Sequence, residues 1–289
     1  MLSHIFVTEL KNRGITSLYI GREIPDLQYL AVKMLVKGYG IVEERREGEV
    51  VKEVEGVKLL KRVGSEKSDC VFKKGGKNVI TNPPEYPKIV IDMGLFNELT
   101  EDEKRKTLLQ VNMTLGTIRR FWWDGNLVIV GDLKVGKAVN VQSFKTDAKA
   151  IVLDPQGEID ADEKLIRDTD VFIIGGIVDK GRRLKDATRR LAEMRGYDYP
   201  RVRIKLRDTI VGVPDEINKI AEIVLRVKEG ESLEDAIIST MSKSDKVSRL
   251  LYDTHRFGLQ VLEEEARWLK VDESVINVVK SRLKASKTY

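Results

Sequence analysis

The sequence predicts an α/β protein in which a parallel sheet lies between a small α+β segment and a C-terminal helical segment. Three observations lead to this fold class. Short apolar runs alternate with helical patterns from Lys88 onward, alternation and turn residues fill roughly the first 80 residues, and the last fifty or so have helical periodicity. Strands this apolar, separated by helices, are typical of a parallel sheet covered on both faces.

Residues 1–84 are expected to form the α+β segment. In "PDLQYLAVKMLVKGYG" apolar side chains recur with a helical period that stops near Gly38 and Gly40. The following "IVEERREGEVVKEVEGVKLLKRV" mixes alternation with turns at Gly48 and Gly56, which predicts short strands. "KKGGKNVITNPPEYPK" combines glycine, asparagine and proline and therefore predicts a linker.

Residues 85–240 are expected to form the parallel sheet and its helices. The predicted strands are "KIVIDMG", "NLVIVG", "AKAIVLDP", "VFIIGG" and "RVRIKL". "TEDEKRKTLLQVNMTLGTIRRFWW" predicts a long helix with Thr100 as its N-cap, and we interpret Trp122 and Trp123 at its end as core residues. Shorter helices are predicted in "DADEKLIRDT", "GRRLKDATRRLAEMRG" and "PDEINKIAEIVLRVKEG", and two or three amphipathic helices in residues 241–289.

Composition excludes several classes of site. The 289 residues include one cysteine, Cys70, so neither a disulfide framework nor a cysteine-based zinc cluster can form. With only His4 and His255, a histidine-rich metal site or a histidine-centred triad is not expected either. Because no apolar run approaches the roughly 18 residues of a membrane span, we expect a soluble, cytoplasmic protein that binds no metal and no membrane.

Charge is unevenly distributed along the chain. The net charge is +4 over residues 1–80, −2 over 81–240 and +3 over 241–289. Within residues 180–207, eleven lysines and arginines face only three acidic residues, and this stretch includes Lys180, Arg182, Arg183, Arg189 and Arg190. Four of these arginines are expected on one helix with too few acids nearby to neutralise them. Such a positive field suits a polyanion, most commonly nucleic acid.

The stretch "VFIIGGIVDKG" is the candidate site. A strand that ends in Gly175 and Gly176 lets the backbone approach a ligand closely, although spacing alone favours a tight turn as the explanation of the glycines. Asp179 could act as a general base, accept a hydrogen bond from a ligand, or be an ordinary loop residue. Asp154 closes the strand "AIVLDP", where an Asx turn is the alternative to a ligand contact. Carboxyl ends of parallel strands are where such sheets bind ligands.

The ordered motifs "KIVIDMGLFNELTEDEKRKTLLQVNMTLGTIRRF", "AIVLDP", "VFIIGGIVDKG" and "RVRIKLRD" resemble the archaeal and eukaryotic tRNA purine-9 N1-methyltransferases of the SPOUT superfamily. The resemblance covers roughly residues 85–240. It implies a SPOUT sheet with a C-terminal trefoil knot that holds S-adenosylmethionine, an exception to the rule against knots. It also implies three domains: an RNA-binding α+β domain at 1–84, a methyltransferase domain at 85–240 and a helical domain at 241–289.

The resemblance assigns roles to individual residues. Asp179 matches the family's proposed general base, and the basic residues Lys180, Arg182, Arg183, Arg189 and Arg190 would contact RNA. Ile204, Lys205 and Leu206 stand where the family usually has Leu-Pro-Ile, so the loop lacks the family's proline and the resemblance does not specify its exact contacts. The cofactor would be bound by Leu153, Asp154, Gly175, Gly176, Ile177, Val178, Leu206, Arg207, Gly212 and Val213.

The resemblance thus implies S-adenosylmethionine-dependent methylation of N1 of the purine at position 9 of tRNA, with a slight preference for adenine. The enzyme is expected to act as a monomer on tRNA. A non-catalytic RNA-binding or ribosome-associated protein that keeps the SPOUT fold is the alternative. A third interpretation, methylation of a ribose hydroxyl, fits the "GGIVDK" segment less well.

Overall fold

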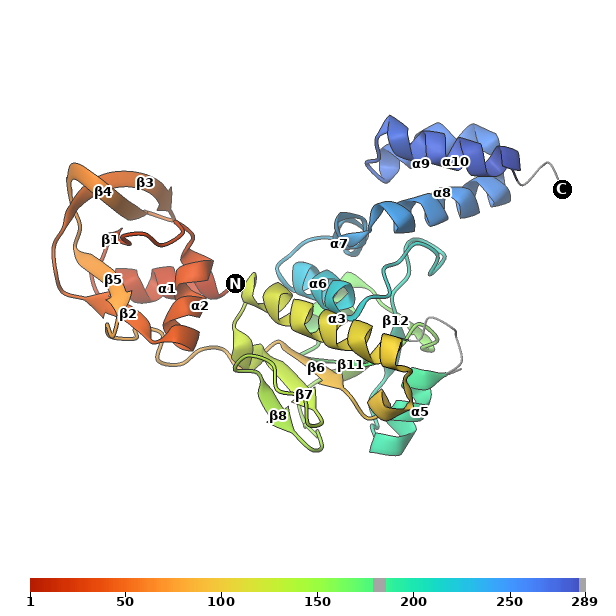
Figure 1. Cartoon of the computed structure of the whole chain (residues 1–289), viewed down its shortest axis with the longest axis horizontal. Helices are drawn as coiled ribbons and strands as arrows, with labels where there is room; N and C mark the ends of the chain where they lie inside the picture. Colours follow the sequence, from red (N-terminus) through yellow and green to blue (C-terminus); the bar gives the residue numbers. More distant parts are fainter. Residues whose placement is uncertain (179–185, 286–289) are drawn as a thin grey trace. The chain divides into compact units, whose positions relative to one another are not determined.

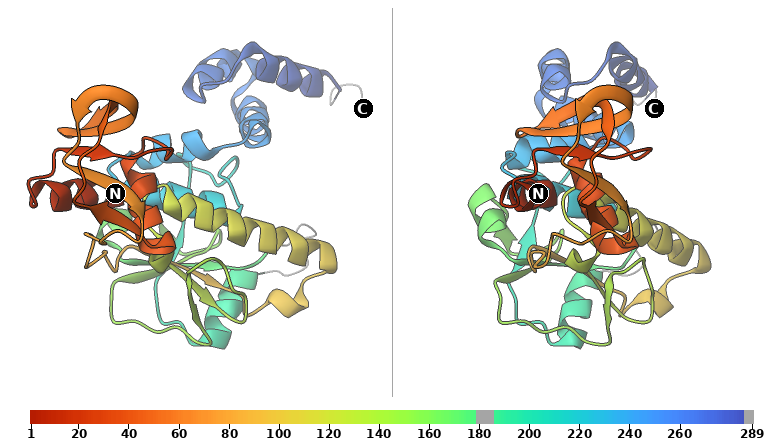
Figure 2. Two further views of the ribbon diagram at one scale, coloured as in Figure 1. Left: turned by 60° about the vertical axis from the view of Figure 1, so that its left-hand side comes forward. Right: turned by 90° about the vertical axis from the view of Figure 1, so that its left-hand side faces the viewer.

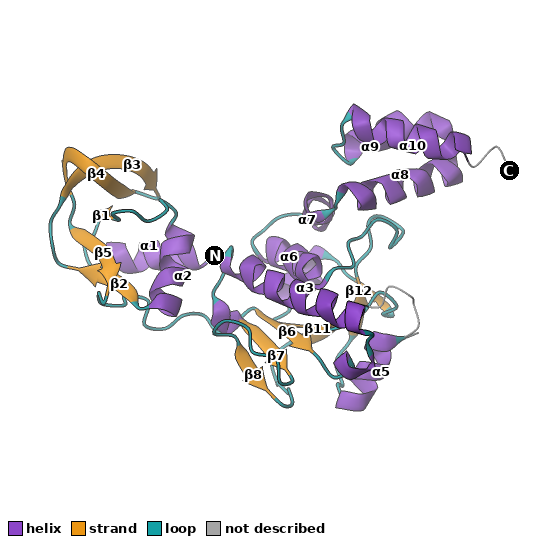
Figure 3. Ribbon diagram, viewed as in Figure 1, coloured by secondary structure: helices purple, strands orange, loops and turns teal. Residues whose placement is uncertain are grey.

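The computed structural model describes residues 1–178 and 186–285, and it divides into two compact units. The first unit consists of Met1–Ile89 and Leu115–Gln142, and the second of Val90–Thr114 and Ser143–Tyr289. Figure 1 shows the labelled elements, and Figure 3 distinguishes helices from strands. The predicted α/β class is confirmed, whereas the three predicted domain boundaries remain a prediction.

The first unit contains a five-stranded mixed sheet beside two helices. The strands run in the order β2-β5-β1-β4-β3, and β1 is parallel to both of its neighbours. The elements are α1 (Leu2–Lys11), β1 (Ser17–Tyr19), α2 (Leu27–Lys37), β2 (Tyr39–Val42), β3 (Glu47–Val54), β4 (Val57–Lys67) and β5 (Cys70–Lys74). The predicted α+β character of this segment is therefore confirmed.

Local sequence signals set the ends of α2. The Asp26 carboxylate caps the helix by accepting a hydrogen bond from the backbone N–H of Tyr29. At the other end Gly38 adopts φ +67°, the left-handed conformation that glycine tolerates best. The buried face of the helix, including Leu30 and Met34, packs into the core of this unit.

Part of the predicted linker belongs to this unit. Lys77 pairs with Ile41 of β2 in an isolated bridge, and the following Val79 and Ile80 are buried in the first unit's core. The prediction of a linker beginning at Lys73 was therefore wrong at its N-terminal end. Two apolar residues inside a glycine- and proline-rich stretch were enough to anchor it, because burial outweighs the local tendency toward a loop.

The long helix α3 (Glu101–Arg119) begins as predicted. The Thr100 hydroxyl and the Glu103 carboxylate form reciprocal cap contacts, with the Thr100 N–H donating to Glu103 at 2.9 Å. The helix ends earlier than the apolar pattern suggests, before Trp122 and Trp123. Both indoles pack against the first unit's core, so the interpretation of these residues as core residues is confirmed.

The first unit also contains two parallel strands, β7 (Leu127–Val130) and β8 (Val139–Val141). Ahead of them, Asp124 in the single turn η2 (Asp124–Asn126) is fully buried and receives two hydrogen bonds from Arg119. This pair joins the end of α3 to the start of β7.

The second unit is built on a sheet whose strands follow the order β10-β12-β9-β11-β6. They are β6 (Lys88–Asp92, of which the last three residues belong to this unit), β9 (Ala150–Leu153), β10 (Ile159–Asp160), β11 (Val171–Gly175) and β12 (Arg201–Arg203). β9 is parallel to β11 and β12, and β10 is parallel to β12, as the alternation of apolar runs and helices predicts.

Helices occupy the rest of the second unit. Those described are α4 (Glu163–Asp168), α5 (Ala187–Arg195), α6 (Ile217–Lys228), α7 (Leu233–Thr240), α8 (Lys243–Phe257), α9 (Leu262–Trp268) and α10 (Glu273–Ala285), with the single turns η1 (Phe96–Glu98) and η3 (Leu259–Val261). The last three helices lie together in every view (Figure 2), which confirms the predicted helical C-terminal segment. In the described part of the chain no helix is long and apolar enough to cross a bilayer.

Candidate functional site

The site begins where β9 and β11 end side by side. In their parallel register Ile174 is paired with Leu153, so the residues after them, Gly175 and Asp154, leave the sheet at the same edge. The sheet thus brings two of the predicted segments together, as expected for the carboxyl ends of parallel strands.

Asp154 is buried and its carboxylate has two partners. One oxygen accepts a hydrogen bond from the N–H of Gln156 at 2.9 Å, which is the Asx turn considered from the sequence. The other accepts from the Arg201 guanidinium at 3.0 Å. Asp154 therefore holds the loop after β9 in place, and its negative charge is largely balanced by Arg201.

A cavity of about 860 Å³ opens beside this loop. Four of the predicted cofactor residues line it: Leu153, Asp154, Gly212 and Val213. Its apolar wall also includes Val202, Ile204, Ile210 and Val211. A volume of this size suits a ligand of nucleoside dimensions, and an apolar wall suits a purine ring.

The polar lining of the cavity is acidic. Among the described residues that line it are Asp154, Asp186, Asp215 and Asp245, and none is a lysine or an arginine. Such a lining disfavours phosphate groups and favours a ligand that carries positive charge. Asp154 and Asp245 already pair with Arg201 and Lys219, so among the described lining residues the negative charge that a cationic nucleoside would meet comes mainly from Asp186 and Asp215.

The ionisation of Asp215 is perturbed by its surroundings. Desolvation of the carboxylate, followed by the nearby charges of Glu216 and Asp245, raises the pKa of Asp215 above its usual value. Sequence reasoning missed this residue, because "VPDE" looks like an ordinary helix start. Its position became visible only when α8 brought Asp245 to the same cavity.

Position 212 of the loop requires a glycine. It has φ +85°, and a Cβ added there would lie 2.7 Å from Cβ of Arg249 and 3.1 Å from Cε of Met241. The backbone of the loop can therefore lie this close to α8 only because residue 212 has no side chain.

Gly176 has a different requirement. Its N–H donates to the carbonyl oxygen of Asp92 at 2.7 Å, and an added Cβ would lie 2.4 Å from Sδ of Met93. Neither Gly175 nor Gly176 has a positive φ, so close packing against the end of β6 explains Gly176 better than a tight turn does. Gly175, Gly176, Ile177 and Val178 are not among the described residues that line the cavity.

Asp92, at the end of "KIVID", holds the end of β6 next to Gly176, and sequence reasoning did not single it out. Its carboxylate is fully buried and accepts hydrogen bonds from the Arg195 guanidinium, the Tyr197 hydroxyl and the N–H of Gly94. Burial, and then the hydrogen bond to Asp92, raises the pKa of Tyr197 far above its usual value. The signal available in the sequence was an acidic residue directly after a buried strand.

Leu206 and Arg207 support the loop rather than line the cavity. Leu206 is fully buried, and its backbone carbonyl accepts a hydrogen bond from Arg249 at 2.7 Å. Arg207 has φ +56° and its guanidinium lies 3.4 Å from the centroid of the Trp268 ring. Both residues therefore lie where α8 and α9 contact the start of this loop.

The described part of the basic segment, residues 186–207, is less positive in the fold than its sequence indicates. Arg189 pairs with Glu193 at 2.9 Å and Arg190 with Glu98 at 3.1 Å. The expectation that too few acidic residues are available to neutralise the segment was therefore wrong for Arg189 and Arg190. Other cations of the segment also have acidic partners, which lie far from them in the sequence. These partners are Asp92 for Arg195, Asp154 and Glu158 for Arg201, and Asp160 for Arg203 and Lys205.

Several predicted residues cannot be placed in the site. Asp179, Lys180, Arg182 and Arg183 lie outside the described residues. The described helix α5 begins only at Ala187, so it contains two of the four arginines expected on one helix.

Known proteins similar to this chain include tRNA methyltransferases named for position 9. Family models for the N-terminal and C-terminal domains of tRNA (adenine(9)-N1)-methyltransferases match residues 1–73 and 242–282. A tRNA (adenine(9)-N1)-methyltransferase of Sulfolobus acidocaldarius is 57% identical over 287 residues, 98% of both chains. A tRNA (guanine(9)-/adenine(9)-N1)-methyltransferase of Thermococcus kodakarensis is 31% identical over 53% of this chain and 47% of its own.

The fold is similar to a solved structure over nearly the whole chain. The crystal structure of Sulfolobus acidocaldarius Trm10 in complex with S-adenosylhomocysteine matches with a TM-score of 0.90 and 53% identity. The match covers 98% of this chain and 99% of that one.

Proposed function

The chain belongs to the tRNA (adenine(9)-N1)-methyltransferase family, and from this premise we propose that it transfers a methyl group from S-adenosylmethionine to N1 of the purine at position 9 of tRNA. The observation that supports this reaction best is the cavity after β9 and β12, which combines an apolar wall with four aspartates. We propose adenine as the preferred base, because the 57% identical relative carries that name.

The residues of the cavity fit S-adenosylmethionine. When bound, this cofactor supplies an electrophilic methyl group on a positively charged sulfur. Ile204, Ile210 and Val211 would contact the adenine ring, and the side-chain-free Gly212 would let the cofactor approach the backbone. Asp215 and Asp245 would stabilise the positive charges of the cofactor, which a lysine-lined cavity would repel.

The chemistry at the base assigns a conditional role to Asp179. Guanine N1 carries a proton that must leave, and a carboxylate positioned beside it would accept that proton. Adenine N1 has a free lone pair, so positioning the base is the first requirement and the extra positive charge is lost afterwards as a proton from the amino group. We therefore propose that Asp179 is a proton acceptor for guanine and an orienting residue for adenine.

The remaining features of the proposal concern architecture and partners. We propose that residues 85–240 contain the family's trefoil knot, that the segments 1–84 and 241–289 contact tRNA, and that the enzyme acts as a cytoplasmic monomer. The net positive charge of both flanking segments supports the tRNA contacts. Arg189 and Arg190 would serve as phosphate ligands by exchanging Glu193 and Glu98 for RNA.

The function is tested with the full chain, methyl-labelled S-adenosylmethionine and unmodified tRNA transcripts. Transcripts with adenine, guanine or a pyrimidine at position 9 are incubated, digested and analysed for labelled nucleosides. We expect 1-methyladenosine from the adenine transcript and no product from the pyrimidine control. Absence of both 1-methyladenosine and 1-methylguanosine would rule out the proposal, and calorimetry without any heat of cofactor binding would favour the non-catalytic RNA-binding alternative.

A further inference from the structure

Arg249 of α8 is a buried cation that nothing in the reaction requires. Its side chain is 2% exposed, and Nε donates to Oδ2 of Asp253, one helical turn away, at 2.6 Å. The other carboxylate oxygen of Asp253 is buried without a partner among the described residues. A buried ion pair of this kind contributes little net stability compared with apolar residues of the same volume, so its position calls for another explanation.

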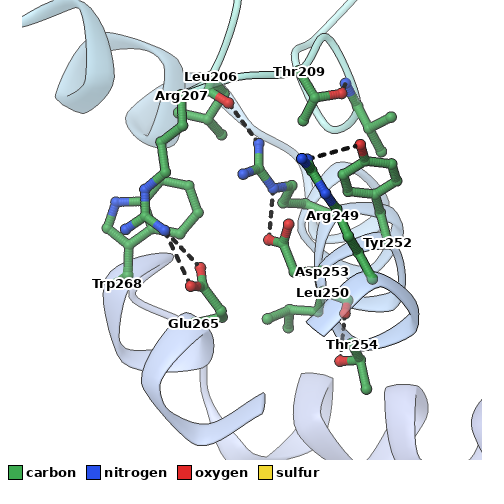
Figure 4. A network of polar contacts seen from close by, with 12 residues as sticks. Leu206, Arg207, Thr209, Arg249, Leu250, Tyr252, Asp253, Thr254, Glu265 and Trp268 are labelled. Atoms are coloured by element: carbon green, nitrogen blue, oxygen red, sulfur yellow. Dashed lines mark hydrogen bonds and ion pairs between the residues drawn. The ribbon is translucent and has the colours of Figure 1, made fainter. Parts of the chain in front are cut away.

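Arg249 contacts the cavity loop at two separated points (Figure 4). Its guanidinium donates to the backbone carbonyl of Leu206 at 2.7 Å, at the start of the loop. A Cβ added to Gly212, near the end of the loop, would lie only 2.7 Å from the Cβ of Arg249. One side chain therefore fixes the loop both by a charge-assisted hydrogen bond and by direct packing.

A second contact from the C-terminal helices supports the first. The guanidinium of Arg207 stacks on the Trp268 ring of α9 and pairs with Glu265 of the same helix at 3.0 Å. Arg207 holds a left-handed backbone conformation, which is unfavourable for arginine unless surrounding contacts maintain it. Arg249 also lies 5.1 Å from the Trp268 ring, so both arginines converge on one indole.

The same helix contributes directly to the cavity. Asp245 and Ser248, on the turn of α8 that precedes Arg249, line the cavity beside Gly212 and Val213. Arg249 thus holds α8 against the loop, and the turn of α8 before Arg249 forms part of the cavity wall.

We infer that the C-terminal helices complete the cofactor site, and that Arg249 is a positioning residue that holds loop 206–213 in the shape that binds S-adenosylmethionine. The inference rests on the proposed function, because it concerns the binding of the methyl donor that this function requires. In this arrangement Arg249 acts through Leu206 and Gly212 and does not touch the cofactor itself. The C-terminal segment therefore serves the methyltransferase centre in addition to any contact with tRNA.

The decisive variant replaces the whole buried pair by Arg249→Met together with Asp253→Leu. Removing only the arginine would leave a buried carboxylate unpaired, whereas the double replacement keeps an apolar, filled interior and is expected to preserve the melting temperature. We expect the dissociation constant for S-adenosylhomocysteine, measured by calorimetry on the full chain, to rise about tenfold, which corresponds to about 1.4 kcal/mol. KM for S-adenosylmethionine should rise similarly, while kcat at saturating cofactor and KM for tRNA change less than about twofold.

Two further variants make the test independent of folding. Lys243→Ala, on the same helix but bonded to Ser274, is the matched control and should leave the dissociation constant unchanged. Arg207→Asn removes the stack on Trp268 but keeps a residue that tolerates the left-handed conformation, and should raise the dissociation constant about threefold. If the double variant fails to fold, Arg207→Asn, at an exposed residue, still tests whether the C-terminal helices hold the cofactor loop.

The outcomes separate the inference from the proposed function. A wild-type chain that binds no S-adenosylhomocysteine would contradict the proposed function and, with it, the role of Arg249. A wild-type chain that binds, together with folded variants that bind equally well, would overturn the inference alone. A uniform loss of kcat and of affinity for both substrates would show that Arg249 merely stabilises the fold.

Discussion

Replacing Gly212 by alanine would introduce one methyl group between the cavity loop and α8. The new Cβ would lie 2.7 Å from Cβ of Arg249, an atom attached directly to a helix backbone that cannot rotate away. At φ +85° the alanine would also be in a region that L-residues rarely adopt. We therefore expect the loop to move away from α8 and the cavity to change shape.

The size of the effect follows from these two contributions. A left-handed conformation costs a non-glycine residue about 1–2 kcal/mol, and an overpacked contact adds roughly 1–3 kcal/mol. The total of about 3 kcal/mol would lower the melting temperature by roughly 6–12 °C for a unit of this size. Gly230→Ala is the matched control, because Gly230 has φ +103° but no atom within 4 Å of an added Cβ.

Thermal unfolding and calorimetry with S-adenosylhomocysteine measure the two consequences. Gly230→Ala should show only the backbone contribution and unchanged cofactor affinity. Gly212→Ala should be less stable than this control by about 1–3 kcal/mol and should bind the cofactor product at least tenfold more weakly. Equal melting temperatures and equal affinities for the two variants would refute the reasoning from close packing.

Four further predictions concern the carboxylates of Asp179, Asp215, Asp92 and Asp69. Asp179→Asn should lower guanine methylation sharply and adenine methylation less, measured as initial rates on transcripts that differ only at position 9. Asp215→Asn should weaken the binding of S-adenosylmethionine, whose sulfur is positively charged, more than the binding of S-adenosylhomocysteine, whose sulfur is neutral. In the wild type the preference for S-adenosylmethionine over S-adenosylhomocysteine should fall as the pH drops through the raised pKa of Asp215, because a protonated carboxyl no longer attracts the sulfonium. In urea unfolding, Asp92→Asn should destabilise the second unit by about 3 kcal/mol, because it disrupts the buried ion pair with Arg195. Tyr197→Phe should destabilise it by about 1 kcal/mol, because it removes only one hydrogen bond. Burial opposes ionisation of the Asp69 carboxyl, but backbone and hydroxyl donors lower its pKa in the folded state. The contribution of Asp69 to the free energy of unfolding should therefore be present above its unfolded pKa of about 3.9 and be lost as the pH falls through its folded pKa. Asp69→Asn should remove this acid dependence of stability.

Each of these predictions has an outcome that contradicts it. Equal losses on both bases would show that Asp179 is not primarily a proton acceptor. An unchanged ratio of the two cofactor affinities would remove Asp215 from the charge recognition of the sulfonium. Equal stabilities of Asp92→Asn and Tyr197→Phe would mean that Arg195 does not depend on the Asp92 charge, and an acid dependence that survives in Asp69→Asn would assign it to other carboxylates.

The elements that the sequence predicted well are those governed by local physics. The capping contacts of Thr100, the left-handed Gly38 and the apolar runs at β9 and β11 all act within a few residues, so period and turn chemistry identify them. The linker was misplaced because Val79 and Ile80 are buried by residues far from them in the sequence. No local pattern contains that information.

The candidate site divides in the same way. Strand ends located Leu153 and Asp154, which line the cavity, since parallel strands place their carboxyl ends at one edge. Asp215 and Asp245 could not be recognised, because their shared cavity exists only after α8 has packed against the loop. The pairing of Arg190 with Glu98, 92 residues apart, was equally invisible in a local count of charges.

Local sequence patterns were sufficient for the alternation of strands and helices, for the expectation that cysteine and histidine build no metal site, and for the family resemblance carried by short motifs around the strand ends. Only the folded chain shows which charges are paired, which glycine must lack a side chain, and which helix packs against the loop at Gly212. The physical reason is that backbone periodicity and capping are properties of neighbouring residues, whereas burial, ion pairing and close approach depend on segments brought together only by folding.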